Sequence, residues 1–286
     1  MDPITQQGVL AAAGAAGAAD PLYVDDVFST FLYDGTGSTI TVNNGLDLSG
    51  EGGLVWVKRR TSSIGNHILV DTERGASKWL RSNSNGDELT ASGTVTAFNS
   101  NGFDLGNYSE INGSGDTGVT WSFRKAPGFF DVVTYNGDSN SGREISHNLG
   151  SVPGMILVKC ISHDGDWTVY HKSAGNTKII KLNTDGAAVT SNHFHNTTPT
   201  ASVFTVGSGL VVNSSLDNRS YVAYLFADDD QSFGTDSDEA IIKCGSYTGN
   251  GQVSGTAVTL GFEPQWLMIR AVDPNGGYWI MQNTMT

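Results

Sequence analysis

After residue 24, short apolar runs alternate with clusters of glycine, asparagine, aspartate and serine along the chain. Residues 40–42 and 95–98 alternate with the two-residue period of a β-strand that buries one face. The Asn101-Gly102 pair after the second run is typical of a tight turn between antiparallel strands. No stretch after residue 26 has the 3.6-residue period of a helix. The pattern predicts an all-β protein made of antiparallel, jelly-roll-like β-sandwiches.

Two further runs predict the cores of these sandwiches. Residues 119–123 and 221–226 alternate between larger apolar side chains and smaller or more polar ones, as strands with one buried face do. The side chains expected to face inward are Val119, Trp121 and Phe123 in the first run and Val222, Tyr224 and Phe226 in the second. We expect Trp121 and Tyr224 to be core residues at equivalent positions of two strands. All six tryptophans are expected in strands.

One sequence unit occurs three times at intervals of about a hundred residues, the size of an ordinary domain. The copies begin with a tyrosine, a turn residue and a glycine at Tyr33, Tyr135 and Tyr247, and their next apolar run ends in a base at Lys58, Lys159 and Arg270. The third copy has only the first half of the unit, which indicates either a longer natural chain or completion by another chain. The sequence therefore predicts tandem sandwich repeats.

The repeat boundaries divide the chain into five parts. Residues 27–127 and 128–230 are two complete repeats, and residues 239–286 are a partial third repeat. Residues 231–238 are an acidic linker. Residues 1–26 differ from the rest, because an Ala/Gly-rich run there has almost no side chain to bury.

The first 26 residues have two alternative interpretations, a disordered leader or an attachment peptide held by a partner surface. We favour the second, because an ordered Ala/Gly run needs contacts that offset its loss of backbone entropy. The attachment residues would be two glutamines that offer hydrogen bonds and three apolar anchors, namely Ile4, Gln6, Gln7, Val9 and Leu10.

The net charge of −13 argues against nucleic acid and anionic membranes as partners, because both would repel the chain. No apolar stretch reaches the roughly 20 residues of a membrane-spanning helix, and the N-terminus has no basic region of a secretory signal. Cys160 and Cys244 occupy non-equivalent positions in their repeats, which favours free thiols over a disulfide framework.

No catalytic constellation recurs in the repeats, so we predict a protein that is not an enzyme and needs no cofactor. Asp71 and Glu73 have the spacing of two carboxylates on one strand face, a glycosidase-like arrangement, but surface polar residues are the favoured interpretation.

Metal binding is also not predicted, although one group of histidines and one group of aspartates contain possible metal ligands. His193 and His195 could bind a metal from one strand face, with His171 or His163 as a third ligand. The acidic residues Asp228, Asp229, Asp230, Asp236 and Asp238 could bind calcium, but they lack the spacing of an EF-hand.

The repeat signature resembles a repeated domain of virion proteins from tailed phages, particularly marine and cyanobacterial phages. The residues that carry the resemblance read GLVWVKRR from Gly53, AFNSNGFDLG from Ala97 and VTWSFRKAPGFFDVVTYNG from Val119. The second repeat departs from the signature at Ala223-Tyr224, which replace Thr120-Trp121. The resemblance covers residues 27 to about 230 and implies a concanavalin-A-like β-sandwich without catalytic residues.

The resemblance implies a structural component of the virion, most directly a tail fibre. Its N-terminal segment would dock on another virion protein, a tail adaptor or nozzle, and its repeats would project toward a host surface glycan or receptor. Fibres of this kind are expected to be homotrimers located on the tail. A capsid decoration protein and a soluble carbohydrate-binding module are the two alternatives.

Overall fold

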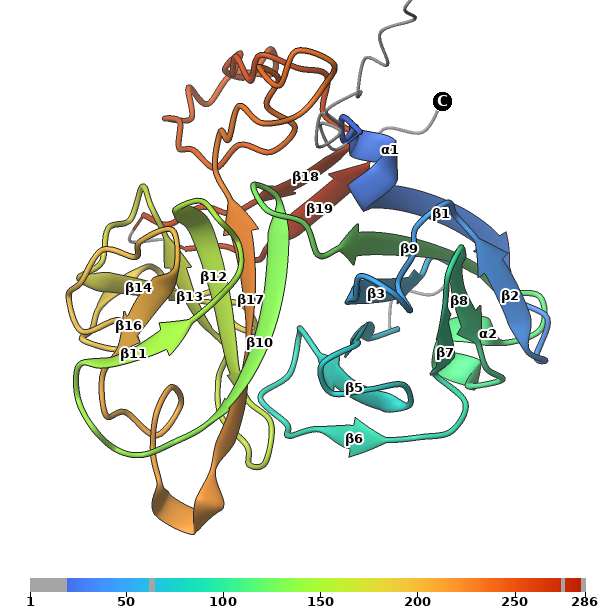
Figure 1. The fold of residues 1–286 in the computed structure, drawn as a ribbon, viewed down its shortest axis with the longest axis horizontal. Coiled ribbons are helices and arrows are strands. Elements are labelled where there is room, and N and C mark those ends of the chain that lie inside the picture. The colour runs from blue at the N-terminus through green and yellow to red at the C-terminus, as the bar shows by residue number, and fades with distance from the viewer. Residues whose placement is uncertain (1–19, 62–64, 274–275, 284–286) are drawn as a thin grey trace, which may run out of the picture.

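The computed structural model describes residues 20–61, 65–273 and 276–283 of the chain. It is an all-β protein of antiparallel sheets, as the alternating pattern predicted (Figure 1). The five proposed attachment residues lie outside the described residues. Within the described ranges, no helix is long and apolar enough to cross a membrane.

The first half of the chain forms one large and one small sheet. The first large sheet has the order β1 (Phe28–Asp34), β9 (Thr117–Arg124), β3 (Gly53–Arg59), β4 (His67–Asp71), β5 (Lys78–Arg81) and β6 (Leu89–Thr90). The small sheet has the order β2 (Ile40–Asn43), β8 (Gly102–Leu105) and β7 (Val95–Asn99). The Asn101-Gly102 turn joins β7 to β8, and Gly102 has a φ of 131° that favours glycine.

The second half of the chain also forms one large and one small sheet. The second large sheet has the order β10 (Phe130–Asn136), β17 (Ser220–Ala227), β12 (Pro153–Cys160), β13 (Thr168–His171), β14 (Lys178–Lys181) and β15 (Val189–Thr190). The small sheet pairs β11 (Arg143–Ser146) with β16 (Val203–Val206). In each large sheet the last strand of that half lies between its first and third strands, and the next three strands follow in order, so the two sheets have the same arrangement.

The two large sheets face each other across one apolar core, and each small sheet covers an outer face (Figure 1). Successive residues of a strand alternate between layers, so Trp56 points into the central core while Val55 and Val57 pack under the small sheet. The central strands of the large sheets are therefore apolar at consecutive positions, because both of their faces are buried. The rings of Phe123 and Phe226 are in contact across the central core, with their centroids 5.4 Å apart.

Trp121 and Tyr224 are core residues at matching positions, as the alternating runs predicted. Trp121 lies on β9 opposite Trp56 of β3, and Tyr224 lies on β17 opposite Leu157 of β12. Both side chains are buried in the central core. The inward face expected of each run is thus the face that meets the other large sheet.

The last described part of the chain contributes a hairpin of β18 (Trp266–Ile269) and β19 (Ile280–Asn283). Figure 1 shows this hairpin beside α1, next to the two large sheets. Trp266, Met268 and Met281 are partly buried against the central core. The expectation that every tryptophan lies in a strand is wrong for Trp167 and Trp279, since each directly precedes a strand.

Within the described part of the chain, helices are limited to single turns, which are too short to produce a visible period in the sequence. They are α1 (Val24–Val27), α2 (Ser109–Asn112) and the 3₁₀ turn η1 (Leu216–Asn218). The acidic residues 231–238, which follow β17, pack against the rest of the protein. Phe233 is buried in the central core, and the Gly234 amide donates to the Leu22 carbonyl at 2.9 Å.

Candidate functional site

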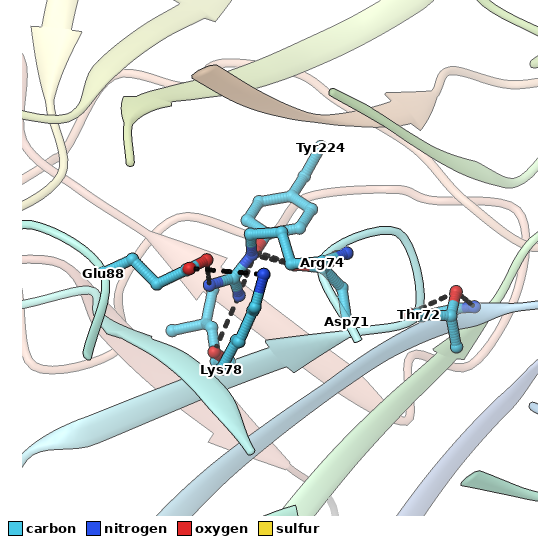
Figure 2. A network of polar contacts seen from close by, with 8 residues as sticks. Asp71, Thr72, Arg74, Lys78, Glu88 and Tyr224 are labelled. Atoms are coloured by element: carbon cyan, nitrogen blue, oxygen red, sulfur yellow. Dashed lines mark hydrogen bonds and ion pairs between the residues drawn. The ribbon is translucent and has the colours of Figure 1, made fainter. Parts of the chain in front are cut away.

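A buried ionic network lies between the two large sheets (Figure 2). Strand β4 ends at Asp71, and the turn that follows brings Arg74 back over the end of that strand. The Arg74 backbone amide donates to Asp71 Oδ1 at 2.9 Å, and its Nε donates to Oδ2 at 2.6 Å. Both side chains are almost completely removed from solvent. A charged pair buried this deeply is stable only when its remaining polar atoms are satisfied.

The remaining polar atoms of Arg74 find partners on both sheets. Its Nη1 donates to Glu88 Oε2 at 3.1 Å, and its Nη2 donates to the Leu69 carbonyl at 3.0 Å and to the Tyr224 hydroxyl at 3.2 Å. Burial alone would lower the pKa of Arg74, but attraction by the carboxylates of Asp71 and Glu88 keeps that pKa above its usual value. Arg74 is therefore a permanently charged link.

Tyr224 joins the second large sheet to this network. Its hydroxyl donates to Asp71 Oδ2 at 2.7 Å, so one carboxylate oxygen binds groups from both sheets. Burial raises the pKa of Tyr224 well above its usual value, which keeps the hydroxyl protonated as a donor. The network can therefore orient the two sheets, while every oxygen of Asp71 is already engaged.

The structure separates the two carboxylates that raised the glycosidase-like alternative. Asp71 is buried at the end of β4, whereas Glu73 lies in the turn that follows and pairs with Lys125 at 2.8 Å. The idea of one shared strand face is wrong, because the strand ends between the two residues. A polar cavity of about 250 Å³ adjoins the network and is lined by Glu73, Arg74, Lys78, Glu88, Thr134, Tyr135, Asn136, Ile161 and Ser220.

The two histidines of the proposed metal pair, His193 and His195, lie in a turn, whereas His171 is the last residue of strand β13. Residues 193–196 form a turn in which Phe194 is buried, and His195 is exposed with a φ of 50°. Burial lowers the pKa of His193 and His171. Among the residues that the structure describes, no three His, Cys, Asp or Glu side chains form a group that could hold a metal ion.

The acidic residues considered for calcium are partly engaged with ammonium groups. Asp228 pairs with Lys172 and also accepts the Cys244 backbone amide at 2.8 Å. Asp229 pairs with Lys243 at 3.3 Å. The Asp228–Lys172 pair ties the chain that follows β17 to the end of β13, and the contacts of Lys243 and Cys244 hold that chain to itself.

Cys160 and Cys244 are free thiols, and burial raises the pKa of Cys244 to about 12.

An apolar cavity of about 340 Å³ is a second candidate site, which the sequence analysis missed. Its lining combines aromatic side chains of both large sheets with the segments around the β18–β19 hairpin, including Phe28, Phe123, Phe226, Trp266 and Met268. The sequence signal that could have revealed it is the apolar run at residues 266–269, which corresponds to the buried strands β3 and β12.

Two tryptophans make the same contact between successive parts of the fold. Trp167 Nε1 donates to the Arg81 carbonyl at 2.9 Å, so it joins the second large sheet to the first. Trp279 Nε1 donates to the Lys181 carbonyl at 3.2 Å and joins the hairpin to the second large sheet. Arg81 and Lys181 end the corresponding strands β5 and β14. The hairpin therefore makes with the second large sheet the same hydrogen bond that Trp167 makes with the first.

Comparison with known proteins gives one family. A family model described as a domain of unknown function (DUF7483) matches residues 24–286. No curated protein and no solved structure matches the chain.

Proposed function

We propose that this chain, which belongs to the DUF7483 family of unknown function, is a structural component of a phage virion, namely a tail fibre. The observation that carries the proposal is the apolar core that the two large sheets share. The hydrogen bonds of Asp71 to Arg74 and Tyr224 link the two sheets at this core. A shared core and a buried polar link hold neighbouring units in one orientation, as a load-transmitting virion protein requires.

Tandem repetition supports this proposal. The two large sheets have the same strand arrangement, and the tryptophan contact of Trp167 recurs at Trp279. We take residues 27–127 and 128–230 as two β-sandwich repeats and residues 239–286 as part of a third. Units that meet through one repeated contact can extend a structure by simple addition.

The N-terminal segment completes the proposal as the anchor on the virion. Ile4, Val9 and Leu10 would pack on a tail adaptor or nozzle protein, and Gln6 and Gln7 would add hydrogen bonds. Three chains would share one docking site in a homotrimer. The repeats would then project toward a glycan or receptor on the host.

Deletion of residues 2–20 in the phage that encodes the chain tests this anchor. The purified deletion protein should keep the circular dichroism spectrum and melting temperature of the full chain, yet be absent from purified particles. A matched control replaces residues 11–19 with a Gly/Ser sequence of equal length, which keeps the five anchor residues and should preserve incorporation. Normal incorporation of the deletion protein would contradict the anchor and favour attachment through the sandwiches, as in a capsid decoration protein.

A further inference from the structure

The structure contains two joints that use the same set of hydrogen bonds. The first joint connects the two large sheets, and the second connects the second large sheet to the β18–β19 hairpin. At the first joint the Glu88 amide donates to the Ile161 carbonyl at 2.9 Å, and at the second the Ala188 amide donates to the Val272 carbonyl at 3.4 Å. A further bond recurs at 2.8 Å, from the amides of Gly165 and Gly277 to the carbonyls of Asn85 and Asp185. Together with the tryptophan contact, these bonds form both joints.

The buried ionic network has no counterpart at the second joint among the described residues. Its three charged members, Asp71, Arg74 and Glu88, correspond to His171, Ala174 and Ala188 in the second large sheet and its turns. The second joint therefore forms without these charges. Since the shared hydrogen bonds suffice to make a joint, the network at the first joint indicates an additional role there.

The second large sheet contributes uncommitted polar side chains to the polar cavity of about 250 Å³ beside the network. Thr134 and Asn136 lie on the same face of β10 as Val132, which points into the central core, and Ser220 lies opposite Asn136 on β17. The side chains of Thr134, Asn136 and Ser220 therefore face the first large sheet. None of these three side chains forms a hydrogen bond with another described residue.

The first large sheet contributes the charged side of the cavity, where Figure 2 shows Arg74, Lys78 and Glu88 grouped together. Arg74 makes four hydrogen bonds through its side chain, which leaves one of the five N–H groups of a guanidinium free, on Nη1. The Lys78 ammonium is 3.9 Å from Glu88 Oε1, beyond hydrogen-bond distance. Only Oε2 of Glu88 is bonded to Arg74. The cavity therefore offers both free donors and a free carboxylate oxygen.

The charges that line the cavity restrict the class of ligand. Glu73 and Glu88 would repel an anionic ligand, and Arg74 and Lys78 would repel a cationic one. A matching ligand is therefore neutral and must satisfy donors and acceptors together. Sugar hydroxyl groups do so, because each one can donate one hydrogen bond and accept others.

We propose that this cavity binds one neutral pyranose residue of a glycan. Two neighbouring hydroxyl groups of the ring bind Glu88 Oε1 and Lys78 Nζ, one as donor and the other as acceptor. The hydroxyls of Thr134 and Ser220 and the amide of Asn136 fix the orientation of the ring. The inference rests on the proposed function for its setting, in which the glycan belongs to the host surface, but binding itself is a property of the isolated chain.

Titration of the full chain with the methyl glycosides of glucose, galactose and mannose, followed by amide chemical shifts in NMR spectra, tests the proposal. These probes differ in which hydroxyl groups are axial, and at least one should bind saturably. Lys78→Met should weaken that binding at least about tenfold, since it removes a charged donor. Lys178→Met is the matched control, because it changes the corresponding lysine of the second large sheet, and it should leave binding unchanged. Both lysines are exposed, so both variants should keep the melting temperature of the chain.

The same spectra locate the bound glycoside. Shifts should change within residues 73–88 and 134–136 and stay constant within residues 173–188, the corresponding part of the second large sheet. Absence of saturable shifts up to about 100 mM of every glycoside would overturn the proposal, as would equal weakening by the two lysine variants. Binding of glucuronate or glucosamine in place of the neutral glycosides would overturn the neutral class of ligand. None of these outcomes depends on where the chain is located in a virion, so a failure here is distinguishable from a failure of the proposed function.

Discussion

Replacement of Arg74 by methionine tests the network that joins the two large sheets. The substitution keeps the apolar stem of the side chain and removes the guanidinium that binds Asp71, Glu88 and Tyr224. Asp71, which has no exposed surface, then keeps only the Tyr224 hydroxyl and a backbone amide as donors. Removing one partner of a buried ion pair costs about 3–5 kcal/mol of unfolding free energy, and we expect a loss in that range.

Two matched variants calibrate this loss. Tyr224→Phe removes one hydroxyl bonded to charged groups and should cost about 1.5–3 kcal/mol. Arg59→Met removes a cation from an ion pair whose side chains are 19% and 25% exposed, so it should cost about 0–1 kcal/mol. The expected order of loss is therefore Arg74→Met, then Tyr224→Phe, then Arg59→Met.

Urea unfolding at pH 7, followed by tryptophan fluorescence and circular dichroism, measures these differences. The double variant Asp71→Leu/Arg74→Met should recover part of the loss, because it removes the unpaired buried carboxylate. A loss for Arg74→Met no larger than that for Arg59→Met would refute the assignment of the network as the link between the sheets. A double variant less stable than Arg74→Met would refute the unpaired carboxylate as the cause.

Three further predictions concern single positions. Trp121→Ala should cost about 3–5 kcal/mol in urea unfolding, because it empties a buried aromatic site, and an unchanged unfolding midpoint would contradict this. Gly118→Val should cost about 1–3 kcal/mol by the same assay, since an added Cβ would lie 2.1 Å from the Tyr33 ring, and a neutral result would contradict that contact. Burial, with a smaller effect of Lys58, lowers the pKa of His67 to about 4 in the folded protein. On acidification, the imidazole of the unfolded chain therefore takes up a proton near pH 6.5, before that of the folded chain does. The free energy of unfolding should fall as the pH drops from about 6.5 to 4. His67→Gln should flatten this fall in pH-dependent melting curves, and an equal fall in the variant would assign it to other groups.

Local alternation predicted the strands well, because side-chain direction in a strand depends only on neighbouring residues. It placed Trp121 and Tyr224 on the correct faces. It did not predict that these faces meet each other, since association of two sheets is a long-range property. A signal existed in the continuous apolar run of residues 155–158, which is typical of a strand buried on both faces.

The candidate sites were harder to predict for physical reasons. Nothing local distinguishes Arg74 from a surface arginine, because its burial depends on Tyr224, which is 150 residues away. Asp71 and Glu73 have the spacing of one strand face, but the strand ends at Asp71 and the next turn redirects Glu73. The spacing of His193 and His195 fits one face of a strand, but these residues form a turn in which Phe194 is the buried residue.

Detection of the chain on phage particles is the most direct test of the proposed function. Gold-labelled antibodies raised against residues 27–230 can be applied to purified particles of the phage proposed to carry the chain and viewed by electron microscopy. The proposal predicts label on the tail, away from the head, and loss of that label when residues 2–20 are deleted. Absence of label from purified particles, or label spread over the head, would contradict it.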